Sequence, residues 1–160
     1  MRILDSGKRR EFETGAVRDI TEGKGRCDLL PLDIVSDVCG EPIFEYINDY
    51  VRTGDTDNII DAIRVFSVQH YGTTYNAILE LSQHYEEGAK KYSDRNWEKG
   101  IPCHCYVDSG VRHFIKHSRG DKDEPHDRAF LWNMYGLLWT HHNKPELIDL
   151  PFREDVENEN

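Results

Sequence analysis

Hydrophobic residues recur at helical spacing along most of the chain from Pro31 onward. Two short apolar repeats, one after Pro31 and one after Pro42, predict short helices, and a repeat over Ile59–Val68 predicts a helix of about three turns. A stronger repeat predicts a helix from about Thr73 to Lys91, with Thr73-Thr74 as its N-cap. The predicted core face of that helix consists of Tyr75, Ile78, Leu79, Ser82, Tyr85 and Ala89.

Two further helices are predicted in the C-terminal half. One runs from about Tyr106 to Arg119 and is broken at Gly120. The last begins near Asp123, because Pro125 is tolerated in a first turn. Its core face is predicted to carry Phe130, Leu131, Met134, Leu137 and Leu138. Since no segment shows convincing strand alternation, the predicted fold class is all-α.

The length of 160 residues predicts a single domain over residues 1–160. Residues 1–30 are polar and glycine-rich without a helical or strand period, so they are expected to form an extended arm on the surface. Residues 153–160 are acidic and are expected to form a frayed tail.

The formal net charge of −10 is unevenly distributed, because residues 1–26 carry +2 and the rest of the chain −12. This balance excludes binding to polymeric nucleic acid by bulk electrostatics, which requires an excess of Lys and Arg. The N-terminus lacks an apolar signal region and no window approaches 18 apolar residues, so no membrane association and a cytoplasmic location are expected. Four cysteines are few for a disulfide framework and are expected to be reduced.

Acidic residues form the first candidate site. Glu86 and Glu87 lie near the C-terminal end of the predicted long helix, and Glu124 and Asp127 are three residues apart on the last helix. Side chains at that spacing share a face, and carboxylates beside an apolar stripe need a cation. Mg²⁺ suits this role, because it is held by one or two carboxylates and by substrate phosphates. The alternative is that these acids merely favour a first helical turn.

Cations and an aromatic residue follow the first acidic pair, where Lys90, Lys91, Arg95, Asn96 and Trp97 are close in sequence. Cations suit phosphates, and an aromatic ring with an amide suits a base. The alternative is a solvated helix end, with core packing as the role of Trp97.

Further cations come from the arm, where Lys24 and Arg26 lie among glycines as in a phosphate-contacting loop, although the Walker A spacing is absent.

Two other readings involve histidine. The dipeptide His126-Asp127 with Asp149 suggests an HD-type phosphohydrolase with a transition metal, although Asp149 follows by only 22 residues. The further histidine that such a site needs could be one of those upstream, which are His104, His113 and His117. The run Cys103-His-Cys105 has no partner motif with which to close a tetrahedral zinc site, so these residues are expected to pack or lie in a loop. A non-enzymatic helical module that binds nucleotides is a third possibility.

Six ordered segments together resemble the dATP/dGTP diphosphohydrolase family of bacteriophages and bacteria, which is similar to the MazG-like all-α pyrophosphatases. The segments are residues 14–19, 23–31, 84–92 (His-Tyr-Glu-Glu-Gly-Ala-Lys-Lys-Tyr), 94–100, 108–113 and 123–133 (Asp-Glu-Pro-His-Asp-Arg-Ala-Phe-Leu-Trp-Asn). The resemblance implies a MazG-like helical bundle that hydrolyses a deoxypurine triphosphate to the monophosphate and pyrophosphate with Mg²⁺ or Mn²⁺. It also implies cytoplasmic action, in the host if the protein is phage-encoded.

Carried over by position, the resemblance implies catalytic roles for Glu87, Glu124 and Asp127. It implies that the same three residues, together with Glu86, bind the metal. The implied substrate-binding residues are Lys24, Arg26, Lys91, Arg95, Asn96, Trp97 and Asn133. One departure is that MazG-like enzymes pair two acids at ExxE spacing, whereas this spacing pairs Glu87 with Lys90 here.

A homo-oligomer, dimer or tetramer, is also expected. The last helix carries a second apolar stripe of Trp132, Tyr135 and Trp139 that needs cover, and MazG-like folds cover such stripes with a partner subunit.

Overall fold

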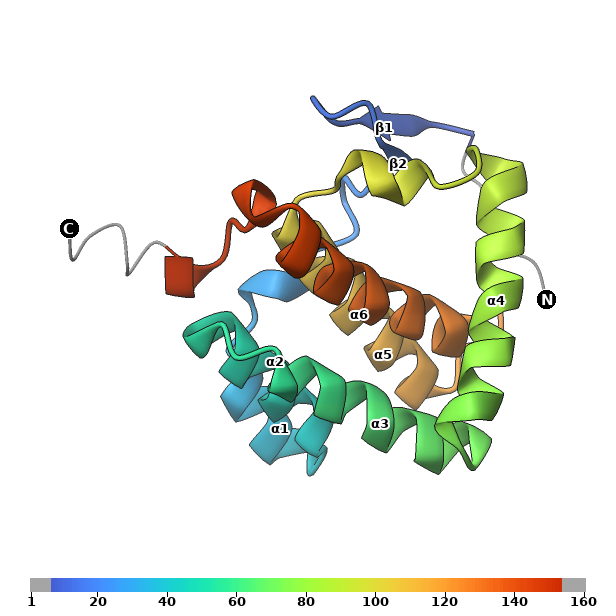
Figure 1. Ribbon diagram of the computed structural model, residues 1–160. Coiled ribbons are helices and arrows are strands. Elements are labelled where there is room, and N and C mark those ends of the chain that lie inside the picture. Colours follow the sequence, from blue (N-terminus) through green and yellow to red (C-terminus); the bar gives the residue numbers. More distant parts are fainter. Residues whose placement is uncertain (1–6, 154–160) are drawn as a thin grey trace.

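The computed structural model describes residues 7–153, which are mostly helical (Figure 1). The α-helices are α1 (Leu32–Cys39), α2 (Pro42–Thr53), α3 (Asp57–Tyr71), α4 (Thr74–Lys91), α5 (Cys103–Arg119) and α6 (His126–Asn143). Short 3-10 helices are η1 (Cys27–Leu29), η2 (Asn96–Lys99) and η3 (Pro145–Leu147). Strands β1 (Arg9–Glu11) and β2 (Val17–Asp19) form a small antiparallel sheet. The all-α prediction is therefore confirmed.

The N-terminal arm contains this strand pair, which the hydrophobic pattern did not predict. Arg10 lies opposite Arg18 in the ladder. Each strand has three residues, so neither is long enough to display an alternation of period two. Residues 1–6 and the predicted frayed segment from residue 154 to 160 lie outside the described residues.

Helices α5 and α6 run side by side through the middle of the molecule (Figure 1) and share its most extensive helix interface. Two glycines allow the close approach. A Cβ on Gly110 would lie 2.5 Å from Met134 Cε, and one on Gly136 would lie 2.8 Å from Tyr106 Cζ. Because Tyr106 is fully buried, its ring has little room to move away from α6.

A cluster of phenylalanine rings ties α2 and α3 to this pair. Phe44 packs edge-on against Phe114 with 5.1 Å between ring centroids, and Phe66 lies 4.7 Å from Phe130. Offset and edge-to-face ring pairs at such distances stabilise a core beyond the area they bury. The cluster therefore attaches the α1–α3 region to the helices that carry the site.

Helix α4 begins as predicted, because Thr73 Oγ1 accepts a hydrogen bond from the Asn76 backbone N–H at 3.0 Å. Its predicted core face is wrong. The buried residues of α4 are Ala77, Leu81 and His84, whereas Tyr75 is 80% and Leu79 is 69% exposed. The helix has apolar residues on two sides, and periodicity alone does not tell which side meets α3 and α6.

Helix α6 begins at His126, three residues later than predicted. Pro125 takes the N-cap position with φ −77° and ψ 77°, outside the helical region, and a residue before proline is itself disfavoured from helical geometry. Glu124 therefore precedes the helix, while Asp127 belongs to its first turn. The predicted core face is confirmed for Phe130, Leu131, Met134 and Leu137, which are fully buried, whereas Leu138 is only partly buried.

The arm and α4 enclose one side of α5 and α6. The strand pair lies near the C-terminal end of α4 and beside η2 (Figure 1), where Lys91 Nζ pairs with Asp19 at 3.0 Å. Within residues 7–153, none of the helices combines the length and hydrophobicity needed to cross a bilayer.

Candidate functional site

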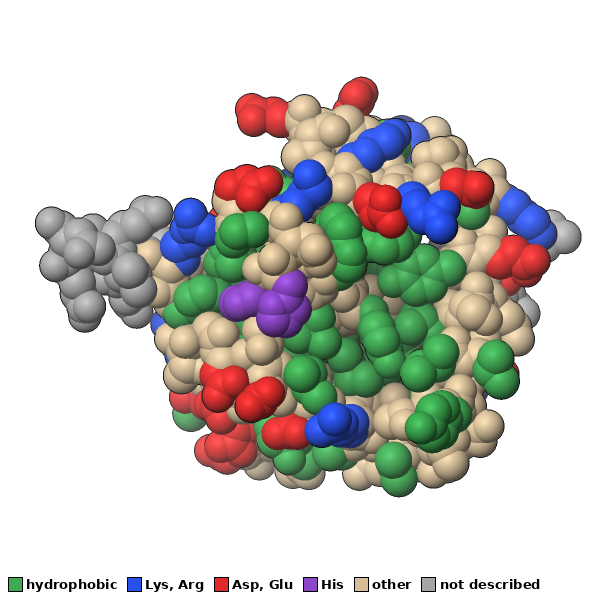
Figure 2. Space-filling view, viewed as in Figure 1, with side chains coloured by type: hydrophobic (Ala, Val, Ile, Leu, Met, Phe, Trp, Pro, Cys, Tyr) green, Lys and Arg blue, Asp and Glu red, His purple; other side chains and the backbone are tan. Residues whose placement is uncertain are grey.

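A cavity of about 690 Å³ lies between the arm, α4, η2, α5 and α6. On the face viewed in Figure 2, hydrophobic side chains gather over α6 and toward α4. The cavity lining includes seven of the residues predicted for the site, which are Lys24, Lys91, Arg95, Asn96, Trp97, Glu124 and Asn133. It also includes Arg18, His84, Tyr85, His113, Lys116 and Trp132, which the family resemblance did not assign to the site.

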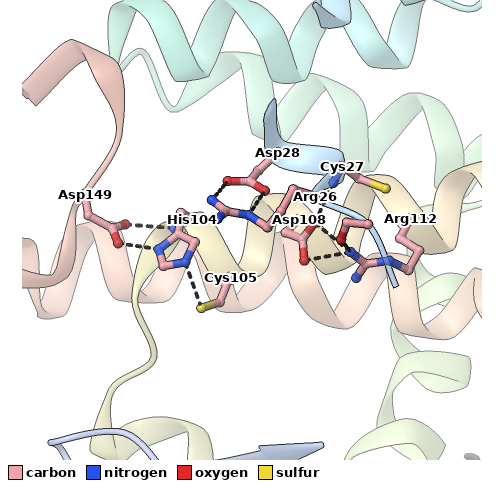
Figure 3. Close-up of polar contacts among 9 residues, drawn as sticks. Arg26, Cys27, Asp28, His104, Cys105, Asp108, Arg112 and Asp149 are labelled. Atoms are coloured by element: carbon pink, nitrogen blue, oxygen red, sulfur yellow. Dashed lines mark hydrogen bonds and ion pairs between the residues drawn. The ribbon is translucent and has the colours of Figure 1, made fainter. Parts of the chain in front are cut away.

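A buried ion pair on α5 anchors the arm against the cavity (Figure 3). Arg112 Nη2 lies 2.7 and 2.8 Å from the two carboxylate oxygens of Asp108 and also donates to the Gly25 carbonyl at 2.7 Å. Asp108 Oδ1 in turn accepts the Cys27 backbone N–H at 2.7 Å. These contacts place the neighbouring residue, Lys24, at the cavity wall.

A second anchor joins η2 to β2. The Asn96 side chain accepts from the Val17 N–H and donates to the Val17 carbonyl, each at 2.8 Å. Because both ends of this amide are occupied, Asn96 holds the shape of the cavity mouth. Lys91 is likewise engaged by Asp19, which also pairs with Arg9 at 3.0 Å.

Arg18 reaches from β2 into the cavity over two aromatic rings. Its guanidinium carbon lies 5.3 Å from the Trp132 ring centroid and 5.7 Å from that of Tyr106. Its Nη2 donates to Asn133 Oδ1 at 3.2 Å, and Asn133 Nδ2 donates to the Ala129 carbonyl. Asn133 therefore positions Arg18, a residue of the predicted extended arm.

Aromatic rings from α4, η2 and α6 also line the cavity. Trp97 packs edge-on against Tyr85 at 5.8 Å and against Trp139 at 5.0 Å between ring centroids. Tyr85 also lies 6.2 Å from Trp132. These four rings pack against one another, and all of them except Trp139 also line the cavity. The same aromatic side chains can therefore stabilise the core and contact a ligand.

Two lysines supply positive charge that no carboxylate within residues 7–153 neutralises. Lys24 of the arm and Lys116 of α5 line the cavity, and neither forms an ion pair with any residue of the described part of the chain. Arg95 is 73% exposed at its side chain and pairs with Glu98. Arg26 pairs with Asp28 at 2.7 Å and lines a smaller, separate cavity. The lysines are thus the cations best available to a ligand.

His84 is a buried neutral group at the α4 side of the cavity. Burial, with the Arg128 charge nearby, lowers the pKa of His84 to about 4. Its Nδ1 has no hydrogen-bond partner within residues 7–153. The imidazole therefore contributes to the cavity lining without adding charge at neutral pH.

A cluster of two histidines and one carboxylate lies at the inner wall. His113 Nδ1 is 2.9 Å from His126 Nδ1 and 3.4 Å from Glu124 Oε1, and His126 Nδ1 is 3.7 Å from the same oxygen. On its other side, His126 Nε2 lies 2.7 Å from Asp123 Oδ1. Burial and the neighbouring His126 hold the pKa of His113 well below its usual range.

The other predicted acids do not join Glu124. Asp127 accepts a hydrogen bond from the Tyr71 hydroxyl at 2.6 Å and lies 3.3 Å from His70 Nε2. Burial would raise the pKa of Asp127, but these contacts outweigh it and the pKa is lowered. The expectation that Glu124 and Asp127 share a helix face is wrong, because Glu124 precedes α6.

The acids of α4 also lie apart from Glu124. Glu87 lies 3.7 Å from Arg128 Nη2, while Glu86 is exposed. Within residues 7–153, the carboxylates predicted to hold Mg²⁺ therefore do not form a group whose ligand atoms are close enough to share one ion.

The histidine–aspartate set of the HD reading is not assembled either. Asp149 hydrogen-bonds the His104 ring and accepts the His104 backbone N–H at 2.8 Å (Figure 3). His104 Nε2 in turn lies 3.5 Å from Cys105 Sγ. Cys103 and Cys105 are buried in the first turn of α5, so they pack as expected but not in a loop. All four cysteines are free in the structure.

The family model for the N-terminal part of dATP/dGTP diphosphohydrolase matches residues 63–150, more than half of the chain. The chain belongs to this family. The matched region contains α4, α5, α6 and Glu124, but it begins after the arm that supplies Arg18 and Lys24. No curated protein and no solved structure gave a match. The family name indicates a diphosphohydrolase, which makes the cavity the candidate active site.

Sequence reasoning did not assign Lys116 to the site, and it named His113 only among the upstream histidines of the HD-type alternative. His113 and Lys116 are three apart on α5, and the spacing that places them on one face was visible. What was lacking was any sign that this face meets the loop before α6. Arg18 was equally hidden, because its partners lie about 90 to 115 residues away along the chain.

Proposed function

We propose that the protein hydrolyses a deoxypurine nucleoside triphosphate, dATP or dGTP, to the monophosphate and pyrophosphate in this cavity. The observation that carries the proposal is the joining of unpaired lysines, aromatic rings and a carboxylate in one cavity of nucleotide size. The family name supports the same substrate and the same reaction class.

The phosphates are assigned to the α5 side of the cavity. Arg112 bonds to Gly25, and Lys116 follows Arg112 by one helical turn, so Lys24 and Lys116 lie on neighbouring parts of the wall. His113 and Glu124 belong to the same region. Because the chain carries a net charge of −10, local cations are required to bind a tetra-anionic substrate.

The base is assigned to the aromatic side. Trp97 and Tyr85 present ring surfaces from η2 and α4, and Trp132 with Arg18 forms a stacked floor. A purine has a larger stacking face than a pyrimidine, which favours dATP and dGTP. His84 Nδ1 adds a buried polar atom in the same lining.

Water attack at the α-phosphorus would release pyrophosphate whole, with Lys24 and Lys116 neutralising charge on the phosphate oxygens. A divalent cation held beside Glu124 would neutralise phosphate charge and lower the pKa of an attacking water. Glu124, beside His113, is the carboxylate placed to accept the proton of that water.

The test incubates the protein with each dNTP and Mg²⁺ or Mn²⁺ in ¹⁸O-labelled water. The proposal predicts faster hydrolysis of dATP and dGTP than of the pyrimidine substrates, pyrophosphate as the second product, and label in the monophosphate. Inorganic triphosphate as a product, or label in pyrophosphate, would refute the assigned chemistry. No turnover at all would favour a nucleotide-binding module.

A matched pair of lysines tests the phosphate side. Lys116→Gln should lower kcat/KM by about 10- to 100-fold, since a charge-assisted hydrogen bond contributes about 1.5–3 kcal/mol. Lys90→Gln removes a lysine from exposed helix surface outside the cavity lining and should leave kcat/KM unchanged. Equal effects of the two substitutions would contradict the assignment.

A homo-oligomer is also proposed, although on a different surface from the one predicted. Trp132 and Trp139 pack largely within their own chain, whereas Val68, Tyr75 and Leu79 are exposed on and beside α4. Exposed apolar side chains gathered in this way are typical of an interface. Light scattering should give at least a dimer mass, and Leu79→Glu should lower it. A monomeric mass for the unaltered protein at micromolar concentration would contradict the proposal.

A further inference from the structure

We infer that His113, Glu124 and His126 form a binding site for a divalent transition-metal ion at the inner wall of the cavity. This inference deepens the proposed function, on which it rests for the role of the ion. The metal ligands implied by the family resemblance are carboxylates alone, and of these only Glu124 belongs to the new site, whereas His126 was expected to bind a metal only in the HD-type alternative.

The three donor atoms have the spacing of ligands around one ion. His113 Nδ1, His126 Nδ1 and Glu124 Oε1 are separated by 2.9, 3.4 and 3.7 Å. A triangle with these sides has a point about 2.0 Å from each corner, which matches the bond lengths of about 2.0–2.2 Å for imidazole nitrogen and carboxylate oxygen to such ions. The three donor atoms therefore already have the mutual distances that one such ion requires.

Asp123 completes the arrangement behind His126. Its Oδ1 lies 2.7 Å from His126 Nε2, so the ring donates its Nε2 proton to this carboxylate. In the neutral imidazole the Nδ1 atom then carries the lone pair and accepts the Nδ1–H of His113 at 2.9 Å. A bound ion would take the place of that proton, with His113 protonated on Nε2 instead. A carboxylate that orients a histidine in this way is the usual support of a metal-binding imidazole.

The donor set selects the class of ion. Two imidazole nitrogens and one carboxylate oxygen favour borderline ions such as Zn²⁺, Fe²⁺, Co²⁺ and Ni²⁺, and they accept Mn²⁺. Mg²⁺ prefers oxygen ligands with near-ideal octahedral geometry and gains little from imidazole.

The site is open to the cavity. His113 and Glu124 are both among its lining residues, and three protein ligands leave coordination positions for water or phosphate oxygens. A second group of Asp121, Asp123 and His126 has a suitable spacing, but Asp121 and Asp123 are at the surface and Asp121 is paired with Arg119. The first group is thus the one that a bound nucleotide could reach.

The experiment titrates the chelator-treated protein with Co²⁺ in the absence of nucleotide and follows the visible d–d absorption. One equivalent of Co²⁺ should bind with bands typical of nitrogen and oxygen ligands, and a large excess of Mg²⁺ should not displace it. Glu124→Gln and His113→Asn should each weaken Co²⁺ binding by about 100-fold or more, and Asp123→Asn by about 10- to 100-fold.

The matched control is Asp127→Asn, which removes a carboxylate of the same segment that is bonded to Tyr71. It should leave the Co²⁺ affinity unchanged, and circular dichroism should show native helix content for every variant. Glu124→Gln keeps the size of the side chain, so it reports on the ligand even if His113→Asn perturbs folding. Absence of a Co²⁺ band, displacement by Mg²⁺, or loss of binding in Asp127→Asn alone would overturn the inference. Because no nucleotide is present, failure here is distinguishable from failure of the hydrolysis test.

Discussion

Removal of the Asp108 carboxylate should have the largest effect on stability of any single change near the cavity. Asp108 and Arg112 are both almost completely buried, and Asp108→Ala would leave the Arg112 guanidinium without its charge partner. Breaking a buried pair from one side costs about 3–5 kcal/mol, and the Cys27 N–H would lose its acceptor as well, at about 1 kcal/mol. We therefore expect Asp108→Ala to lower the free energy of unfolding by about 4–6 kcal/mol.

The double variant separates the cost of an orphaned charge from the value of the pair. Arg112→Met alone should also be strongly destabilising, whereas Asp108→Ala with Arg112→Met removes both charges and should cost less than the sum by about 2–3 kcal/mol. Urea denaturation followed by circular dichroism measures all four proteins. Additive effects, or a loss below about 1 kcal/mol for Asp108→Ala, would refute the reasoning.

The same substitution should affect substrate binding, because Asp108 and Arg112 hold Gly25 and Cys27, which flank the arm segment carrying Lys24. Under conditions where Asp108→Ala remains folded, the KM for the triphosphate should rise more than kcat falls. Native KM in the folded variant would show that the arm is positioned by other contacts.

Two further predictions concern packing and pH. Gly136→Ala should lower the free energy of unfolding by about 1–3 kcal/mol, measured by thermal unfolding, because its Cβ would meet the buried Tyr106 ring. Gly110→Ala should have a smaller effect, since the nearest neighbour of its Cβ is the flexible end of the Met134 side chain. Asp149→Asn should cost about 1 kcal/mol near pH 5 in urea denaturation. Asp149 raises the pKa of His104 to about 10, so this stabilisation is complete below about pH 6.5 and is lost toward pH 10. The pKa of Asp149 is itself lowered, so its contribution is lost below about pH 4. A penalty as large at pH 10 as at pH 5 would contradict this account.

The sequence by itself determined the helices and most of their ends. The spacing of apolar residues in α6 predicted its buried face, and Thr73 predicted the start of α4, because both signals are local. The family could also be recognised from ordered segments, of which those from residue 84 onward lie within the matched region. Local patterns of this kind do not depend on how the helices are arranged in space.

Only the tertiary structure decided which side chains meet in the cavity. Pro125 delays the start of α6, and this shift of three residues moves Glu124 away from Asp127 and toward His113. The face of α4 that is buried depends on its contact with α3 and α6, since both faces are apolar. Lys24 reaches the cavity because Arg112, a residue on α5, fixes the arm. Contacts between distant segments follow from packing, which no periodicity within one segment records.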